Sequence, residues 1–297
     1  MSLNFNGMRV VVLLLVLSFY FSVGLAQKSD SLRKEKRVVP WFVERFKISA
    51  GFFYVVNNTN IQVGITGSPG TDIQLEKDLG FNAEVGTFLA NFQWRISSRS
   101  RLTFNYVVVD RSSFHTLDKD LVFAGNTYPV NSLVSTYFNT AIYQFSYGYA
   151  LISKPKLELG LLIGAHVVGT LAGISTVGNA MGSNVSNNFG ITAPIPDLGI
   201  WGGYAFSNHF AVNFDLEYLS LTVGTYSGRL LSSNLTCTYR LVGKLDLSLG
   251  YTGLNYRVAN VKNEVTGVFK CSYNGPVLGV NFSFGKRSWK HLPGLNF

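Results

Sequence analysis

Strict alternation of apolar and other residues recurs along this chain and limits its fold more than any other feature. In the stretch FAVNFDLEYLS (210–220), one row of side chains is bulky and apolar: Phe210, Val212, Phe214, Leu216 and Tyr218. The opposite row holds Ala211, Asn213, Asp215 and Glu217. A period of two is the pattern of a β-strand, whose successive side chains point to opposite faces. The pattern returns in segment after segment between residues 46 and 284, without an amphipathic helix of useful length. We therefore expect an all-β protein.

The connections between these segments alternate in length. Short ones fall at 97–100, 153–156, 207–209 and 242–244, and longer ones at 67–72, 124–132, 175–194, 225–229 and 260–267. Such alternation indicates an up-and-down meander with every tight turn at one end. Outer-membrane barrels have short periplasmic turns and long outer loops, whereas a soluble barrel has no reason to sort its loops in this way. The sequence therefore predicts an antiparallel up-and-down transmembrane β-barrel.

About ten strands are expected, with twelve as the main alternative and eight as the next. The first strand is ambiguous, because NNTN (57–60) reverses the phase of the alternation. The following IQVGI (61–65) is either a bulged continuation or a separate strand, and TDIQLEKDLGF (71–81) is ambiguous as well. An even number of strands leaves both ends of the barrel on the periplasmic side.

Composition and the N-terminus agree with export to a membrane. Charged residues make up 14% of the chain, against about 25% in typical soluble domains, and the mean hydropathy is +0.20. A short apolar stretch after Arg9, with Gly24 and Ala26 before a cut at Gln27, reads as a secretory signal peptide over 1–26; an uncleaved anchor is the alternative. A basic periplasmic segment (27–42), the barrel (43–285) and a basic tail (286–297) follow. Two cysteines exclude a disulfide scaffold.

The net charge of +9 does not indicate a nucleic-acid partner, because much of the excess sits in two terminal clusters, 28–37 and 286–291, without interleaved aromatic residues. Solvated tails, or tails weakly attracted to anionic lipid headgroups, explain them. The expected partners are the lipid bilayer with its lipopolysaccharide, the barrel-assembly machinery and a small solute.

The period-two register assigns each side chain to lipid or to the lumen. Nine residues are expected to line the lumen: Lys47, Arg95, Glu158, His166, Trp201, Asp215, Glu217, Arg240 and Asp246. Five aromatic residues near the periplasmic ends are expected to form an interfacial girdle: Trp41, Trp94, Phe206, Phe210 and Trp289. Large charged residues of both signs in a ten-stranded lumen predict internal ion pairs and a space too crowded for a general diffusion pore.

Several stretches resemble a widespread group of bacterial outer-membrane β-barrel proteins. They are LEKDLGF (75–81), FQWRISSRSRLTFNYVVVDRSS (92–113), LDKDLVFAGNTYPVNSLVSTYFNTAIYQFSYGYAL (117–151) and ELGLLIGAHV (158–167). The resemblance implies a barrel in the outer membrane of a Gram-negative cell and brings no catalytic residues. The chain departs from the usual pattern at its end, where residues 285–297 follow the last strand. Either Phe284 or Phe297 is therefore the terminal aromatic assembly signal.

The candidates for catalysis are weak. His115 lies near Asp110, Ser112, Ser113, Asp118 and Asp120 in sequence, and a Ser/His/Asp set forms there only if the strands align it. No His/Cys pair has metal-ligand spacing, so neither a metal nor a cofactor is expected, and an enzyme ranks third. A narrow small-solute channel or binding barrel ranks first, and a structural or adhesion barrel with a closed lumen and presented loops ranks second.

Overall fold

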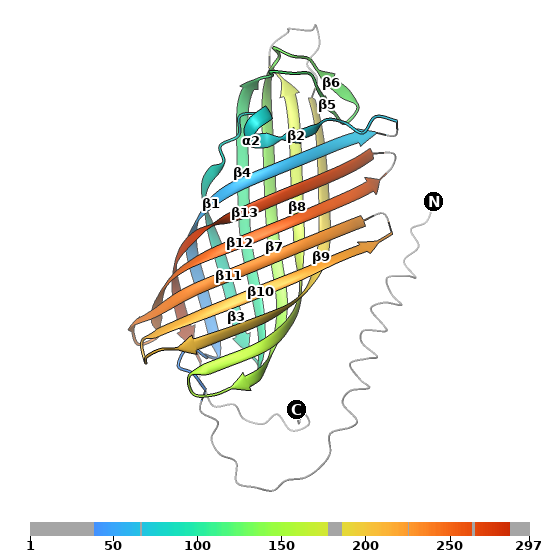
Figure 1. Ribbon diagram of the computed structural model, residues 1–297. Helices are drawn as coiled ribbons and strands as arrows, with labels where there is room; N and C mark the ends of the chain where they lie inside the picture. Colours follow the sequence, from blue (N-terminus) through green and yellow to red (C-terminus); the bar gives the residue numbers. More distant parts are fainter. Residues whose placement is uncertain (1–38, 66, 178–185, 225, 263–264, 286–297) are drawn as a thin grey trace. The chain divides into compact units, whose positions relative to one another are not determined.

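Ten long antiparallel strands form the body of the protein in the computed structural model, which describes residues 39–65, 67–177, 186–224, 226–262 and 265–285. The strands are β1 (Phe46–Ile65), β3 (Glu84–Arg95), β4 (Ser100–Thr116), β7 (Leu133–Ser153), β8 (Leu157–Thr176), β9 (Ser186–Ala205), β10 (Phe210–Val223), β11 (Tyr226–Val242), β12 (Leu245–Lys262) and β13 (Val265–Phe284). Each pairs with the next long strand, and β1 pairs with both β3 and β13, which closes the ring (Figure 1). The expected ten-stranded barrel is confirmed.

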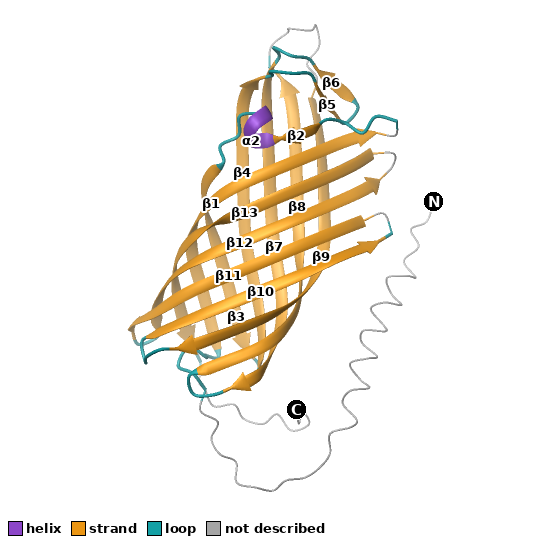
Figure 2. Ribbon diagram, viewed as in Figure 1, coloured by secondary structure: helices purple, strands orange, loops and turns teal. Residues whose placement is uncertain are grey.

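The two ends of the barrel differ in their connections. Tight turns join β3 to β4, β7 to β8, β9 to β10 and β11 to β12 at one end. At the other end three connections are longer, but only two residues join β10 to β11 and two join β12 to β13. The longer connections expected at 225–229 and 260–267 are therefore wrong, because most of these residues continue the strands. A cap occupies the other end (Figure 2), made of β2 (Asp72–Gln74), the one-turn helix α2 (Leu75–Asp78) and the hairpin of β5 (Leu121–Phe123) and β6 (Asn126–Tyr128). The ambiguous stretch 71–81 thus belongs to the cap. No helix in the described residues is long and apolar enough to cross a membrane.

Large apolar side chains cover the outside of the barrel toward the tight-turn end. On β1, β12 and β13 the row of outward residues is more than a third exposed: Ile48, Phe52, Tyr54, Val56, Leu245, Leu247, Leu249, Tyr251, Leu278, Val280 and Phe282. Phe46 stacks on Trp94 and Phe284 at the lower edge of this belt. A soluble protein does not expose a continuous apolar belt of this kind. The belt is the lipid-facing surface of a transmembrane barrel, and the aromatic residues form its rim.

The strands are longer than a membrane crossing requires. β1 has 20 residues and β7 has 21, whereas a tilted crossing takes about 9–11 residues. Toward the cap, the apolar row changes from the outside of the strand to the inside. On β13, for example, Phe269, Cys271 and Tyr273 are buried, while outward Lys270 is exposed. The upper part of the barrel therefore stands outside the membrane, with an apolar interior and a polar exterior.

This exchange of rows explains the ambiguity of the first strand. β1 pairs with β13 in one constant register from Phe46↔Phe284 to Ile65↔Val265, without a bulge. Inward and outward positions alternate without interruption, but above NNTN the apolar residues, such as Ile61 and Val63, occupy the inward positions. The phase reversal in the sequence thus marks where the strand leaves the lipid.

A large hydrophobic cluster, here called the upper core, fills the barrel beneath the cap. Strand residues such as Phe53, Phe138 and Phe269 pack there with the cap residues Leu75 and Phe123. Other members include Leu79, Phe81, Leu121, Ile142, Ile195, Leu230, Leu254, Tyr256 and Tyr273. Because the cap contributes its own apolar side chains, it closes the outer mouth of the barrel.

A partly buried ion pair fastens the cap to the wall of the barrel. Arg111 on β4 donates from Nη1 to Glu76 Oε1 of α2 at 2.7 Å and from Nη2 to Thr59 Oγ1 at 2.6 Å. The backbone N–H of Thr59 donates to the other oxygen of Glu76 at 3.0 Å. The helix is therefore held by charge-assisted hydrogen bonds in addition to its apolar packing.

Candidate binding cavity

A cavity of about 250 Å³ lies inside the membrane-embedded part of the barrel. Most of the residues that line it are polar or charged. The uncharged polar ones include Ser49, Asn91, Gln93, Thr103, Asn105, Gln144, Ser146, Asn213, Ser232, Asn234, Thr236, Thr238, Ser248 and Asn281. Its roof consists of members of the upper core, such as Val109, Ile142, Leu254 and Tyr273. The boundary between the polar walls and the apolar roof lies where the apolar side chains of each strand change from the outward row to the inward row.

Seven of the nine predicted lumen residues line this cavity: Lys47, Arg95, Glu158, His166, Trp201, Asp215 and Glu217. The other two, Arg240 and Asp246, pair with each other toward the tight-turn end, with 3.0 Å between Arg240 Nε and Asp246 Oδ1. The inward phase of these side chains follows from the alternation within each strand. Which of these side chains contact each other depends on how the closed ring places the strands across the lumen.

Trp201 lies between two arginines in the lumen. The ring of Trp201 on β9 has the guanidinium carbon of Arg101 3.8 Å from its centroid and that of Arg95 at 5.1 Å. Its indole N–H donates to the carbonyl oxygen of Leu161 at 3.2 Å. Glycine is required opposite it, because a Cβ at Gly160 would lie 2.7 Å from the indole nitrogen.

Both arginines are also paired with carboxylates from other strands. Arg95 on β3 makes a two-pronged contact with Glu158 on β8, with 2.7 Å between Nη1 and Oε1. Both side chains are at most 2% exposed. Arg101 on β4 pairs with Asp215 on β10, and β7, β8 and β9 lie between them in the ring. These ion pairs bridge the lumen and leave little free cross-section near Trp201.

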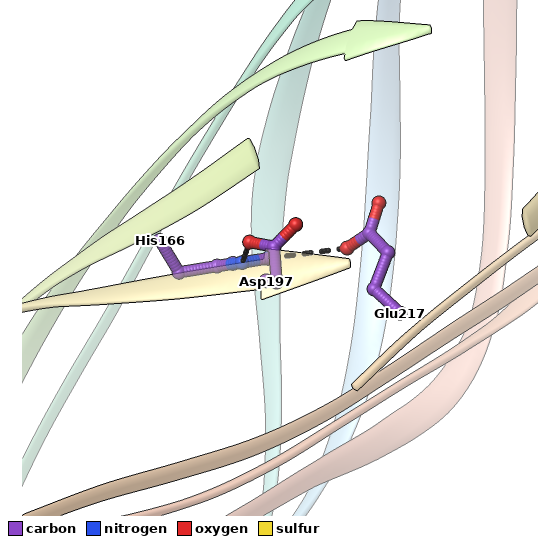
Figure 3. Close-up of side chains that lie close together, drawn as sticks. All are labelled: His166, Asp197 and Glu217. Atoms are coloured by element: carbon purple, nitrogen blue, oxygen red, sulfur yellow. Dashed lines mark hydrogen bonds and ion pairs between the residues drawn. The ribbon is translucent and has the colours of Figure 1, made fainter. Parts of the chain in front are cut away.

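His166, Asp197 and Glu217 form a second polar cluster, here called the His–Asp–Glu cluster. They project toward one another from β8, β9 and β10 (Figure 3). His166 Nδ1 lies 2.8 Å from Asp197 Oδ2, and its Nε2 lies 3.7 Å from Glu217 Oε2. All three residues are at most 3% exposed. Gln144 Nε2 donates to Glu217 Oε1 at 2.7 Å and orients that carboxylate from β7.

The chain before β1 closes the tight-turn end of the cavity. Phe42 lines the cavity and packs with Val43 against Ala205 and Ala211. Trp41 donates its indole N–H to the Ser207 carbonyl at 2.8 Å. This short segment, residues 39–45, is here called the floor segment.

Arg240 fastens the floor segment to the barrel. Its guanidinium carbon lies 4.4 Å from the centroid of the Trp41 ring, and its Nη2 lies 3.4 Å from Glu44 Oε1. The same guanidinium pairs with Asp246 on β12. One side chain therefore links the floor segment to two strands of the wall.

The residues expected in the periplasmic girdle take different places. Trp94, Phe206 and Phe210 lie on the outside, 38%, 58% and 36% exposed. Trp41 is at the same end, but its ring packs on Arg240 and the floor segment, because this part of the chain folds into the mouth of the lumen. Trp289, the expected signal peptide and the basic tail with Phe297 lie outside the described residues.

Sequence reasoning missed several site residues, although alternation gives Arg101 and Asp197 the same inward phase as Thr103 and Trp201. Arg101 and Asp197 are inward residues whose partners lie on other strands, and Phe42 comes before the first strand. The apolar residues of the upper core had one signal, the phase reversal at NNTN. At the outer rim, His115 Nε2 lies 3.9 Å from Asp118 Oδ2, and no hydrogen bond joins a serine hydroxyl to His115 within the described residues. Cys237 is exposed and Cys271 buried, both as free thiols.

Comparison with known proteins gives similarity of fold only. No family model matches the chain. No curated protein matches its sequence. The outer membrane protease OmpT of Escherichia coli is 10% identical, with 82% of this chain and 100% of that chain covered and a TM-score of 0.48. The translocator domain of the autotransporter NalP from Neisseria meningitidis is 10% identical over 94% and 98%, at 0.38. The toluene transporter TodX of P. putida is 9% identical over 82% and 91%, at 0.33.

The location of the protein follows from its own surface. The barrel is closed, and its lower exterior is apolar with an aromatic rim. All four turns at one end are short, whereas three of the five connections at the cap end are long. Together these are the features of an outer-membrane β-barrel. In barrels of this class the short turns lie on the periplasmic side and the long loops on the extracellular side.

Proposed function

We propose that this outer-membrane barrel binds a small polar solute in its lumen and admits it from the periplasmic side. The observation that carries the proposal is a charged cavity with unequal closures. At the extracellular end, the whole upper core and the cap lie between the cavity and the cell exterior. At the periplasmic end, only the short floor segment separates the cavity from the periplasm. The periplasmic closure has far less apolar contact to lose on opening, which favours entry there.

The lining of the cavity supports a small polar ligand. Its volume of about 250 Å³ is slightly below the range of about 300–1,000 Å³ for drug-sized ligands. Lys47 lines it and forms no ion pair within the described part of the chain. Asp246 and Asp215 lie near this ammonium. Among the surrounding hydroxyl and amide groups, it suits a solute with an anionic or hydrogen-bond-accepting group.

Cysteine labelling of the cavity tests this proposal. Ser146, a buried lining residue, becomes the reporter as Ser146→Cys after Cys237 and Cys271 are replaced by serine. The protein is folded in detergent micelles, so that a small charged thiol reagent meets both ends of the barrel. Two matched substitutions then weaken one closure each: Phe42→Ala in the floor segment and Phe123→Ala in the cap.

We expect Phe42→Ala to accelerate labelling of the reporter several-fold and Phe123→Ala to change it little. Faster labelling with Phe123→Ala than with Phe42→Ala contradicts periplasmic entry. Labelling that stays equally slow in all three proteins contradicts solute binding altogether. Heat-dependent mobility on a denaturing gel shows that each variant is folded.

A closed barrel that presents its extracellular surface is the second candidate. It is favoured by the fastening of the cap through Arg111 and Glu76 and through the 2.9 Å pair of Lys119 with Asp78. Asn187 on β9 also donates to the Tyr128 hydroxyl of β6 at 2.8 Å. A cap held this firmly suits adhesion or reinforcement of the membrane. The labelling experiment separates the two candidates, because a presenting barrel needs no access to its lumen.

A further inference from the structure

We propose that the His–Asp–Glu cluster is a binding site for one divalent transition-metal ion. One ligand atom from each of His166, Asp197 and Glu217 can be chosen so that all three lie within 4.8 Å of one another. The three residues stand side by side on β8, β9 and β10, so the ring of strands holds their spacing (Figure 3). This inference goes beyond the proposed solute binding and does not depend on it.

The pairing of charges inside the barrel points to a cation here. The other interior carboxylates each contact an arginine: Glu158 with Arg95, Asp215 with Arg101, Asp246 and Glu44 with Arg240, and Glu76 with Arg111. Asp197 and Glu217 share a single imidazole instead. Two buried carboxylates without a permanent cation are costly, because a desolvated charge loses several kcal/mol unless it is compensated. A bound divalent ion supplies the missing positive charge.

Unused lone pairs give a second, independent indication. Asp197 Oδ1 and Glu217 Oε2 make no hydrogen bond of good geometry within the described residues, while the Ser232 hydroxyl lies near the Glu217 carboxylate. Asp197 is 1% exposed and Glu217 3% exposed. Buried carboxylate oxygens are normally satisfied, and an unsatisfied pair in one cluster calls for an ion or another ligand.

The donor set selects the class of metal. One imidazole nitrogen and two carboxylate oxygens suit zinc, manganese or iron better than calcium, which takes oxygen ligands alone. Three protein ligands leave at least one coordination position open. His166 and Glu217 line the cavity, so this position faces the lumen and would be filled by water or by a solute.

Neighbouring residues fit the role of a supporting shell. Gln144 orients Glu217 by donating to Oε1, which leaves Oε2 for a metal. Gly164 leaves room for Asp197, because a Cβ there would lie 2.8 Å from Asp197 Oδ1. Hydrogen-bonded ligands and close packing of this kind fix the direction of first-shell donors.

Metal content of the refolded full-length chain tests the site. The protein is refolded in detergent with Zn²⁺ present, so that slow entry into the lumen has no influence, and is then dialysed and analysed by mass spectrometry. We expect the wild type to retain about one more Zn²⁺ per chain than Glu217→Gln or Asp197→Asn. Glutamine at 217 keeps an acceptor for Gln144, so this variant should fold. His209→Gln, on the exposed surface, should retain the ion.

Cobalt absorption provides a second measurement. Co²⁺ in a nitrogen–oxygen site of low coordination number gives visible bands, which we expect in the wild type and not in His166→Gln. Equal zinc content in the folded wild type and in both carboxylate variants overturns the inference, as does a wild type without cobalt bands. The cluster is then an internal hydrogen-bonded group around a histidine. Neither result affects the thiol-labelling test, which uses no metal.

Discussion

Arg101 and Trp201 form a cation–π contact across the lumen, with 3.8 Å between the guanidinium carbon and the ring centroid. They lie on β4 and β9, with β7 and β8 between them in the sheet. Because Arg101 also pairs with Asp215 on β10, a single side chain ties three strands together through the interior. Contacts of this kind make the lower lumen a packed structural element as well as a cavity wall.

Replacement of Trp201 should therefore destabilise the barrel. We expect Trp201→Ala to lower the free energy of unfolding by about 3–5 kcal/mol, the usual range for a buried tryptophan, since it also removes the stacking partner of two arginines. Trp201→Phe should cost less, because a ring remains between the guanidinium groups and only the hydrogen bond to Leu161 is lost. Denaturant titration in micelles, followed by gel mobility, measures both. Equal stability of the alanine variant and the wild type would contradict this role.

The Arg95–Glu158 pair should behave as a buried ion pair. Glu158→Gln leaves the guanidinium of Arg95 without its counter-charge, and we expect a loss of about 3–5 kcal/mol. The double variant Arg95→Met with Glu158→Leu should recover most of this loss, because it removes both charges and keeps similar volumes. The same denaturant titration compares the free energies of unfolding of the wild type, Glu158→Gln and the double variant. A double variant less stable than Glu158→Gln would show that the pair contributes more than charge compensation.

The boundary of the membrane should be visible along the outer face of β12. Leu249 is 61% exposed within the apolar belt, and Leu249→Arg should impair insertion, at a cost of about 2–4 kcal/mol near the midplane. Asn255 has the same outward phase but lies above the exchange of rows, and Asn255→Arg should insert normally. Folding yield into lipid vesicles compares the two. Equal yields would mean that the lipid-facing belt extends farther along the strand than the side-chain pattern indicates.

The wild-type protein should not conduct ions like a general porin. The upper core and the cap block the outer half of the barrel, and the ion pairs around Trp201 narrow the inner half. Recordings in planar bilayers should show no large, stable, ohmic conductance. Such a conductance would contradict the closed lumen, whereas brief small currents remain compatible with an occasional opening of the floor segment.

Local sequence pattern determined the class of the fold and the direction of most side chains. Alternation and the sorted turns predict ten strands, an outward Phe210 and an inward Trp201, because each strand turns successive residues to opposite faces whatever its neighbours are. It also placed the charges of Lys47, Arg95 and Asp215 inside. Which of these charges meet was not accessible in the same way. Arg95 and Glu158 are 63 positions apart, and no spacing rule relates them.

Tertiary structure decided the partners and the division of the barrel into two parts. His166, Asp197 and Glu217 meet because the register between β8, β9 and β10 brings them to one height, and register across a closed ring depends on the tilt and stagger of all strands together. The exchange of apolar rows on β1 and β13 depends on where lipid ends and water begins. Alternation in the sequence does not distinguish the two parts. Apolar side chains face outward where the barrel is in lipid and inward where it is in water, and the strand backbone is the same in both.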